Sequence, residues 1–116
     1  MGRAKELPSP VEMKEAMTRV SAIVDRAAHE LSSLAQEYGV HGSSFACMDG
    51  FLRVTRHDGK WGVYVIKPGE ATALVTGASM PIKLDFLARY PSMLERYRKD
   101  IADLYGKIKE AEEKNL

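Results

Sequence analysis

Apolar residues in the first third of the chain recur every three or four positions, which predicts a long amphipathic helix. The spacing alternates between four and three residues, as in a heptad seam. The seam comprises Met13, Met17, Val20, Val24, Ala27, Leu31, Leu34 and Tyr38. Ser9 precedes Pro10 and stands three residues before Glu12, the arrangement of a capping box with proline at the first helical position. Gly39 suits the left-handed conformation that ends many helices, so the sequence predicts a helix over residues 10–38.

The middle of the chain has the pattern of short strands joined by tight turns. Residues 51–56 and 61–66 are rich in β-branched and aromatic side chains and flank an Asp-Gly pair, which is a strong hairpin signal. Residues 71–76 follow a Pro-Gly pair and favour a third strand, while residues 45–48 suit a shorter edge strand. The prediction is an antiparallel β-meander of three or four strands within residues 45–76.

The last third of the chain returns to helical spacing. Ser79 is a candidate helix cap and Pro81 suits a first helical turn. A second seam of the same spacing comprises Leu87, Tyr90, Leu94, Tyr97, Ile101, Leu104, Ile108 and Ala111. Because proline disfavours helix at the residue before it, Pro91 predicts a break or a kink within the helical residues 80–113. The expected fold is α+β, with a long N-terminal helix, a β-meander and C-terminal helices that pair with the first in a coiled-coil-like bundle.

The length of the two seams predicts contact with a second copy of the chain. A helix over residues 10–38 is about 43 Å long, whereas a six-residue strand spans about 20 Å, so the meander cannot cover the whole seam. The two helices can pair antiparallel within one chain, but apolar residues beside each seam widen the stripe to suit a bundle. We therefore expect a homodimer. The expected interface comprises Met13, Met17, Val20, Val24, Leu31, Leu34, Tyr97, Ile101, Leu104 and Ile108. The alternative is a monomer whose apolar stripes pack only within the chain.

The composition is that of one globular domain. The chain has 116 residues, of which 45% are hydrophobic and 28% charged, and a net charge of +1. These values favour a single domain over residues 1–116, without an overall electrostatic preference for nucleic acid or membranes. No apolar run is long enough for a membrane helix, and the first six residues lack the apolar segment of a secretory signal. Cys47 is the single cysteine, which suits a reducing compartment, so we expect a cytoplasmic protein.

Residue types that carry catalysis or bind metals are scattered along the chain. His29, His41 and His57 are 12 and 16 residues apart, unlike the closely spaced ligands of metal sites. Ser43 and Cys47 lie near His41 in sequence, within a predicted loop and edge strand. Capping, turn formation and burial explain these residues without catalysis. We therefore expect no catalytic residue and no bound metal.

Residues 74–79, Leu-Val-Thr-Gly-Ala-Ser, resemble the opening of the glycine-rich motif of short-chain dehydrogenases. That family places further glycines directly afterwards so that the backbone can approach a pyrophosphate. This chain continues with Met80-Pro81-Ile82-Lys83 and lacks a repeated strand-helix-strand pattern. The sequence therefore predicts no nucleotide site and no cofactor.

Basic and aromatic side chains gather on the predicted hairpin, which suggests an alternative function. Such a surface can stack bases and neutralise phosphates. The candidate contacts are Arg53, Arg56, Lys60, Trp61 and Arg96. Nearby acidic residues dilute this positive field. The sequence thus favours a non-enzymatic, homodimeric interaction or adaptor protein with another protein as its partner. A nucleic-acid-binding regulator is the first alternative and a small enzyme the second.

Overall fold

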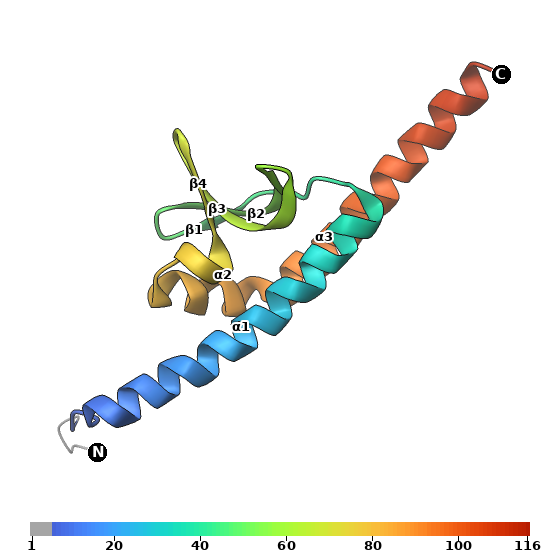
Figure 1. Ribbon diagram of the computed structural model, residues 1–116. Helices are drawn as coiled ribbons and strands as arrows, with labels where there is room; N and C mark the ends of the chain where they lie inside the picture. The colour runs from blue at the N-terminus through green and yellow to red at the C-terminus, as the bar shows by residue number, and fades with distance from the viewer. Residues whose placement is uncertain (1–5) are drawn as a thin grey trace.

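The computed structural model describes residues 6–116 and confirms the α+β fold class (Figure 1). The elements in chain order are α1 (Pro10–Tyr38), β1 (Phe45–Cys47), β2 (Gly50–His57), β3 (Lys60–Lys67), β4 (Glu70–Ala73), α2 (Leu74–Gly77) and α3 (Met80–Lys114). Residues 1–5, which make up most of the stretch inspected for a secretory signal, lie outside the described part. The sheet and α2 lie on one side of the two long helices, and the two chain ends lie at opposite ends of the molecule (Figure 1).

The first helix begins and ends where its local sequence signals predict. The Ser9 N–H donates to Glu12 Oε1 at 2.8 Å, and the Glu12 N–H donates to Ser9 Oγ at 3.0 Å. Both halves of the capping box therefore form. Gly39 has a φ of 64° and its N–H donates to the Ala35 carbonyl at 2.8 Å, which closes the last turn.

The sheet is an antiparallel meander in the order β1-β2-β3-β4, as predicted. The turn between β2 and β3 is formed by Asp58 and Gly59, with φ values of 51° and 79°; positive φ at both positions is the signature of a type I′ hairpin turn. The predicted strand over residues 71–76 is wrong in its second half, because β4 ends at Ala73 and α2 follows. Leu74 is fully buried at the start of α2, and this burial outweighs the weak extended preference of the residues after it.

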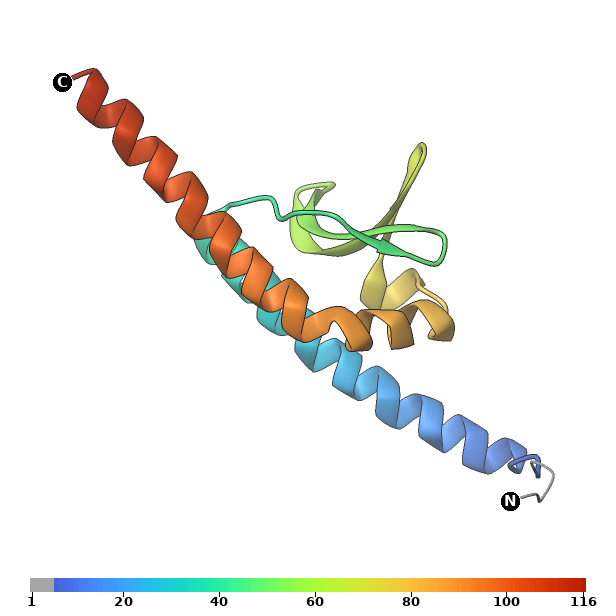
Figure 2. The same ribbon diagram turned by 180° about the vertical axis from the view of Figure 1, so that it is seen from behind.

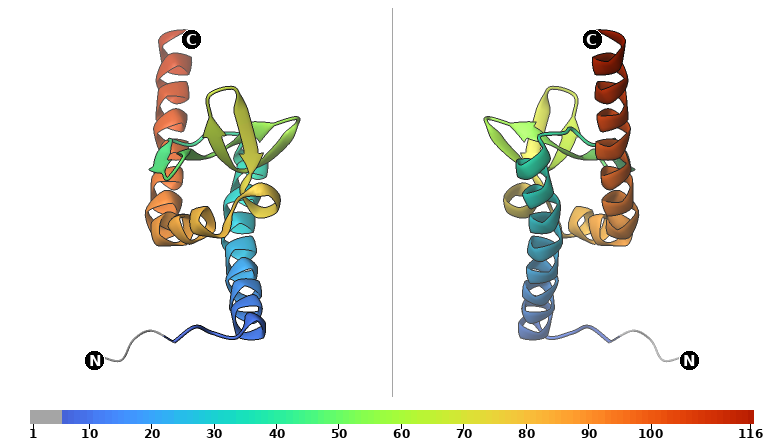
Figure 3. Two further views of the ribbon diagram at one scale, coloured as in Figure 1. Left: turned by 90° about the vertical axis from the view of Figure 1, so that its left-hand side faces the viewer. Right: turned by 90° about the vertical axis from the view of Figure 1, so that its right-hand side faces the viewer.

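Of the break or kink predicted near Pro91, the structure shows the kink, because α3 runs unbroken from Met80 to Lys114 with Pro91 inside it. The helix bends so that its first part lies at a steep angle to the rest (Figure 3). Proline removes one N–H donor, and its ring crowds the carbonyl four residues earlier, which kinks a helix. Phe86 and Met93 are both buried, so the core holds the helix on either side of the bend.

The two long helices run side by side in the same direction, not antiparallel (Figures 1 and 3). Tyr90 of α3 bonds to Glu30 of α1, and Tyr97 bonds to Val40 just beyond α1, so both helices advance together. They overlap over only part of their lengths: α1 extends past α3 at one end and α3 extends past α1 at the other (Figure 2). The molecule is therefore elongated, with extents of 70 × 33 × 24 Å.

The hydrophobic core lies where the sheet, α2 and α3 cover the second half of α1. Its buried members are Val24, Ala27, Ala28, Leu31, Ala35, Leu52, Val54, Val63, Val65, Leu74, Ile82, Phe86, Met93 and Tyr97. On the sheet, Leu52 pairs with Val65 and Val54 pairs with Val63, so one face of the hairpin supplies all four strand residues. Both long helices and the hairpin contribute to this core. The part of each helix that extends beyond the core stays exposed.

Candidate functional site

The core divides each helical seam into a covered part and an exposed part. Val24, Leu31 and Tyr97 were expected in a dimer interface, but the chain itself buries them almost completely. Val20, Leu34 and Ile101 are partly buried against the core. The remaining expected interface residues are Met13, Met17, Leu104 and Ile108, whose exposed fractions lie between 41% and 55%. The seam residues still available to a partner therefore lie at the two ends of the molecule.

The first end forms an apolar groove that we call the amino-terminal groove. It lies between the start of α1 and the residues that lead into α3, and it has a volume of about 660 Å³. The apolar lining residues are Pro10, Met13, Met17, Ala78 and Met80, and Lys14 and Lys83 also line the groove. Methionine side chains are flexible and adapt to irregular partners, so this groove suits an apolar side chain from another molecule.

The second end forms a smaller apolar groove, here called the carboxyl-terminal groove. It lies where α1 ends against α3 and has a volume of about 290 Å³. It is lined by Tyr38, Gly39, Val40, Ile101, Leu104, Tyr105 and Ile108. Tyr105 and Tyr38 expose more than half of their surface. Tyr38 ends the first seam and Tyr105 flanks the second, so sequence periodicity indicated both without showing that they lie close together.

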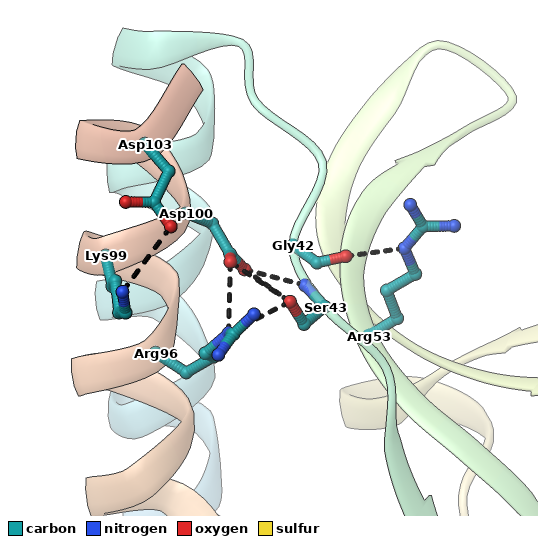
Figure 4. A network of polar contacts seen from close by, with 7 residues as sticks. All are labelled: Gly42, Ser43, Arg53, Arg96, Lys99, Asp100 and Asp103. Carbon is teal, nitrogen blue, oxygen red and sulfur yellow. Dashed lines mark hydrogen bonds and ion pairs between the residues drawn. The ribbon is translucent and has the colours of Figure 1, made fainter. Parts of the chain in front are cut away.

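A polar network next to this groove joins α3 to the segment between α1 and β1 (Figure 4). The Asp100 carboxylate accepts hydrogen bonds from the Ser43 N–H at 2.8 Å and from the Ser43 hydroxyl at 2.9 Å. Arg96 Nε donates to the same carboxylate at 3.1 Å. The Asp100 side chain is only 13% exposed, and its charge is compensated by these donors. The network fixes the chain where α1 ends and α3 continues alone.

Two tyrosine hydroxyls tie α3 to the rest of the chain. The Tyr97 hydroxyl donates to the Val40 carbonyl at 2.6 Å; burial raises the pKa of Tyr97, the bond to Val40 lowers it, and the nearby Asp100 charge raises it. The Tyr90 hydroxyl donates to the Glu30 carboxylate. Burial and this bond raise the pKa of Tyr90 to about 12. Both hydroxyls therefore stay protonated and act as fixed donors at neutral pH.

The histidines and the cysteine occupy separate positions with structural contacts of their own. His41 Nδ1 lies 2.6 Å from Thr55 Oγ1, and the His41 ring packs 4.9 Å from the Trp61 ring. The His57 ring packs edge-on against Tyr64, and Cys47 lies in β1 against the core. Within residues 6–116, no three His, Cys, Asp or Glu side chains cluster closely enough to hold a metal ion.

The candidate nucleic-acid contacts on the hairpin are divided between the two faces of the sheet. Arg56 pairs with Trp61 across the hairpin, so they share one face of the sheet, whereas Arg53 and Lys60 belong to the opposite face by strand alternation. Arg53 Nε donates to the Gly42 carbonyl at 2.7 Å. Arg96 and Arg53 approach the segment that contains Ser43 from opposite sides (Figure 4) and line one cavity of about 500 Å³, which also holds the carboxylates of Asp100 and Asp103.

Comparisons with known proteins add no family to this geometry. No protein-family model matches the chain, and no similar chain was found among curated proteins or solved structures. Over the part of the chain that the structure describes, no helix is long and apolar enough to cross a membrane.

Proposed function

We propose that the protein is a small, non-enzymatic interaction protein that forms a homodimer through the exposed ends of its two long helices. The observation that carries this proposal is that both seams continue in register beyond the core. Met13 and Met17 extend the first seam at one end, and Leu104 and Ile108 extend the second seam at the other.

The free energy of burial supports association. Removing one Leu, Ile or Met side chain from water contributes about 1.5–3 kcal/mol when burial is complete. Single exposed apolar residues are ordinary on protein surfaces, but apolar residues one helical turn apart in a groove mark interaction sites. A second copy brings helices of the same pattern and can cover one of the two grooves in each chain.

The remaining groove supports the adaptor part of the proposal. A dimer that uses one pair of grooves leaves the other pair at the far ends of the assembly, where another protein can bind. We place this activity in the cytoplasm, since Cys47 is a free thiol and single free thiols persist best in reducing compartments. The scattered contacts of His41, His57 and Cys47 favour association over catalysis as the activity of the chain.

Light scattering on the full chain and four variants tests the proposal. One variant carries Met13→Glu with Met17→Glu, and another carries Leu104→Glu with Ile108→Glu. The controls are Ala22→Glu and Ala102→Glu, each of which places one glutamate on an exposed residue off the seams. We expect a wild-type dimer between about 1 and about 100 μM, at least one monomeric double variant with unchanged circular dichroism, and dimeric controls.

Two results would overturn the proposal. The first is a wild-type chain that stays monomeric over the whole concentration range. The second is a dimer that both double variants leave intact, because the association would then use a surface other than the two grooves.

A further inference from the structure

The free end of α3 carries a charge pattern beside its apolar seam. Three residues directly follow seam positions at intervals of seven, and they therefore lie in one row along the helix. These residues are Arg98, Tyr105 and Glu112. The row thus has a basic residue at one end, an acidic residue at the other and an exposed aromatic residue midway between them.

This row complements itself when two copies are antiparallel. In an antiparallel helix pair, this row of residues on one helix lies next to the same row on the other helix. Arg98 of each copy then lies opposite Glu112 of the second copy, and Tyr105 meets Tyr105 near the two-fold axis. Arg98 forms no salt bridge within residues 6–116, and Glu112 is paired only with the exposed Lys109. Both charges are therefore available to a partner.

The register that pairs Arg98 with Glu112 also brings the apolar seams of the two copies together. It places Leu104 opposite Ile108 of the second copy and Ile101 opposite Ala111 of the second copy. These layers continue the contact that α3 makes with α1 inside the chain, because the helix of the second copy begins to cover the seam where α1 ends at Tyr38. The carboxyl-terminal groove thus receives a helix like the one that covers the rest of α3.

Steric arrangement favours this orientation over a parallel one. Up to Tyr97, α3 is covered by α1 and the segment that follows it, and Ile101 is only partly buried. A parallel second copy would place two α1 helices between the two α3 helices and hold the free ends apart. An antiparallel copy approaches from the free end instead. Lys107 of one copy then lies opposite Lys107 of the second copy near the axis, which is a like-charge contact.

We infer that two copies of this chain associate through the free ends of α3, antiparallel about a two-fold axis near Gly106, with Arg98 and Glu112 paired in both directions. This inference rests on the proposed self-association and names the surface and register that carry it. It leaves both copies of the amino-terminal groove, with Met13 and Met17, uncovered at the far ends of the dimer.

Charge reversal with sedimentation equilibrium tests the register. Glu112→Arg replaces two attractive contacts in the dimer by two repulsive ones and is expected to raise the dimer Kd by about tenfold or more. Combining Glu112→Arg with Arg98→Glu restores the attraction with reversed signs and returns the Kd to within about threefold of wild type. Glu113→Arg is the matched control, because it makes the same charge change on the adjacent residue away from the seam, and it leaves the Kd unchanged.

Distances between spin labels test the orientation independently. In a Cys47→Ser background, a labelled cysteine replaces Gly106, whose surroundings leave room for a side chain, or Asn115. Antiparallel pairing gives a short distance at position 106. At position 115 it gives a distance longer by about 27 Å along the axis, from a rise of about 1.5 Å per residue on both helices. Short distances at both positions would indicate parallel pairing, and long distances at both would indicate pairing through α1; either result overturns the inference.

The outcomes separate this inference from the function on which it rests. A wild-type chain that stays monomeric overturns both. The antiparallel register alone is overturned if the wild type is a dimer but Glu112→Arg leaves its Kd unchanged. It is also overturned if Glu112→Arg raises the Kd and the additional Arg98→Glu substitution does not lower it again.

Discussion

The hydroxyl of Tyr97 donates a 2.6 Å hydrogen bond to the backbone carbonyl of Val40, which lies 57 residues earlier in the chain. The Tyr97 ring is buried against Gly42, where an added Cβ atom would lie 3.0 Å from Tyr97 Cδ1. This contact lies where α1 has just ended and α3 continues. Seam residues of α3 before it are covered by the chain itself, and those after Ile101 are exposed.

Tyr97→Phe keeps the buried ring and removes the hydrogen bond. The Val40 carbonyl then loses its donor, and we expect the free energy of unfolding to fall by about 1–2 kcal/mol. Urea denaturation at a fixed protein concentration measures this change. Ser44→Ala is the control, because the Ser44 side chain is exposed, and the loss of its hydroxyl should alter stability by less than about 0.5 kcal/mol. Equal stabilities for wild type and Tyr97→Phe would show that the bond contributes nothing.

Asp100→Asn tests the polar network at the end of the helical overlap. The amide cannot supply the negative charge that accepts bonds from Ser43 and Arg96, so we expect a loss of about 1–3 kcal/mol in thermal or urea unfolding. Asp103→Asn is the matched control, since its ion pair with Lys99 is exposed and exposed pairs contribute about 0–1 kcal/mol. A larger loss for Asp103→Asn than for Asp100→Asn would contradict the importance given to the network.

Stability should fall at alkaline pH, partly because of Tyr90. Burial and the Glu30 carboxylate raise the pKa of Tyr90 from 10.0 to about 12, with a small opposing effect of Arg98. Because the folded state holds this proton more tightly than the unfolded state, the stabilisation is complete below pH 10 and is lost as pH rises from 10 towards 12.

Tyr90→Phe should make this alkaline decline shallower, though not abolish it, since the pKa values of Tyr64 and Tyr97 are raised as well. Urea unfolding of wild type and Tyr90→Phe at about pH 8, 10 and 11 measures the difference. Parallel declines in the two proteins would rule out the contribution of Tyr90.

The basic residues of the hairpin lie on both faces of the sheet, which disfavours binding to nucleic acid. Arg56 and Arg53 belong to opposite faces of the sheet, so few phosphates could be contacted at once. We expect no salt-dependent retention of single-stranded RNA or DNA in filter binding at about 50 mM salt, where phosphate contacts are strongest. Binding that weakens with salt and with Arg56→Gln would instead support the regulatory alternative.

Elements with local signals could be predicted from sequence. The ends of α1 follow from Ser9, Glu12 and Gly39, whose capping interactions involve residues three or four positions away. The hairpin between β2 and β3 follows from Asp58-Gly59, because a two-residue turn with positive φ fixes the register of both strands. Periodicity likewise identified the seam residues of both grooves, namely Met13, Met17, Tyr38, Ile101, Leu104 and Ile108.

Features that depend on distant contacts could not be predicted in this way. Pro91 stays within α3 because residues on both sides of it are held in the core, and Leu74 turns into α2 because the core accepts its side chain. The seams showed which residues are apolar, but not that the sheet returns the chain so that α3 runs parallel to α1 with an offset. That offset decides which half of each seam is buried, and so moved Val24, Leu31 and Tyr97 from the expected interface into the core.

The molar mass of the protein in solution decides whether two copies associate through the ends of α3. We expect light scattering at about 50 μM to give twice the 12.9 kDa of the chain, and Leu104→Glu with Ile108→Glu to reduce the mass to that of one chain while the helices persist. A mass of one chain for the wild type at this concentration would contradict this association.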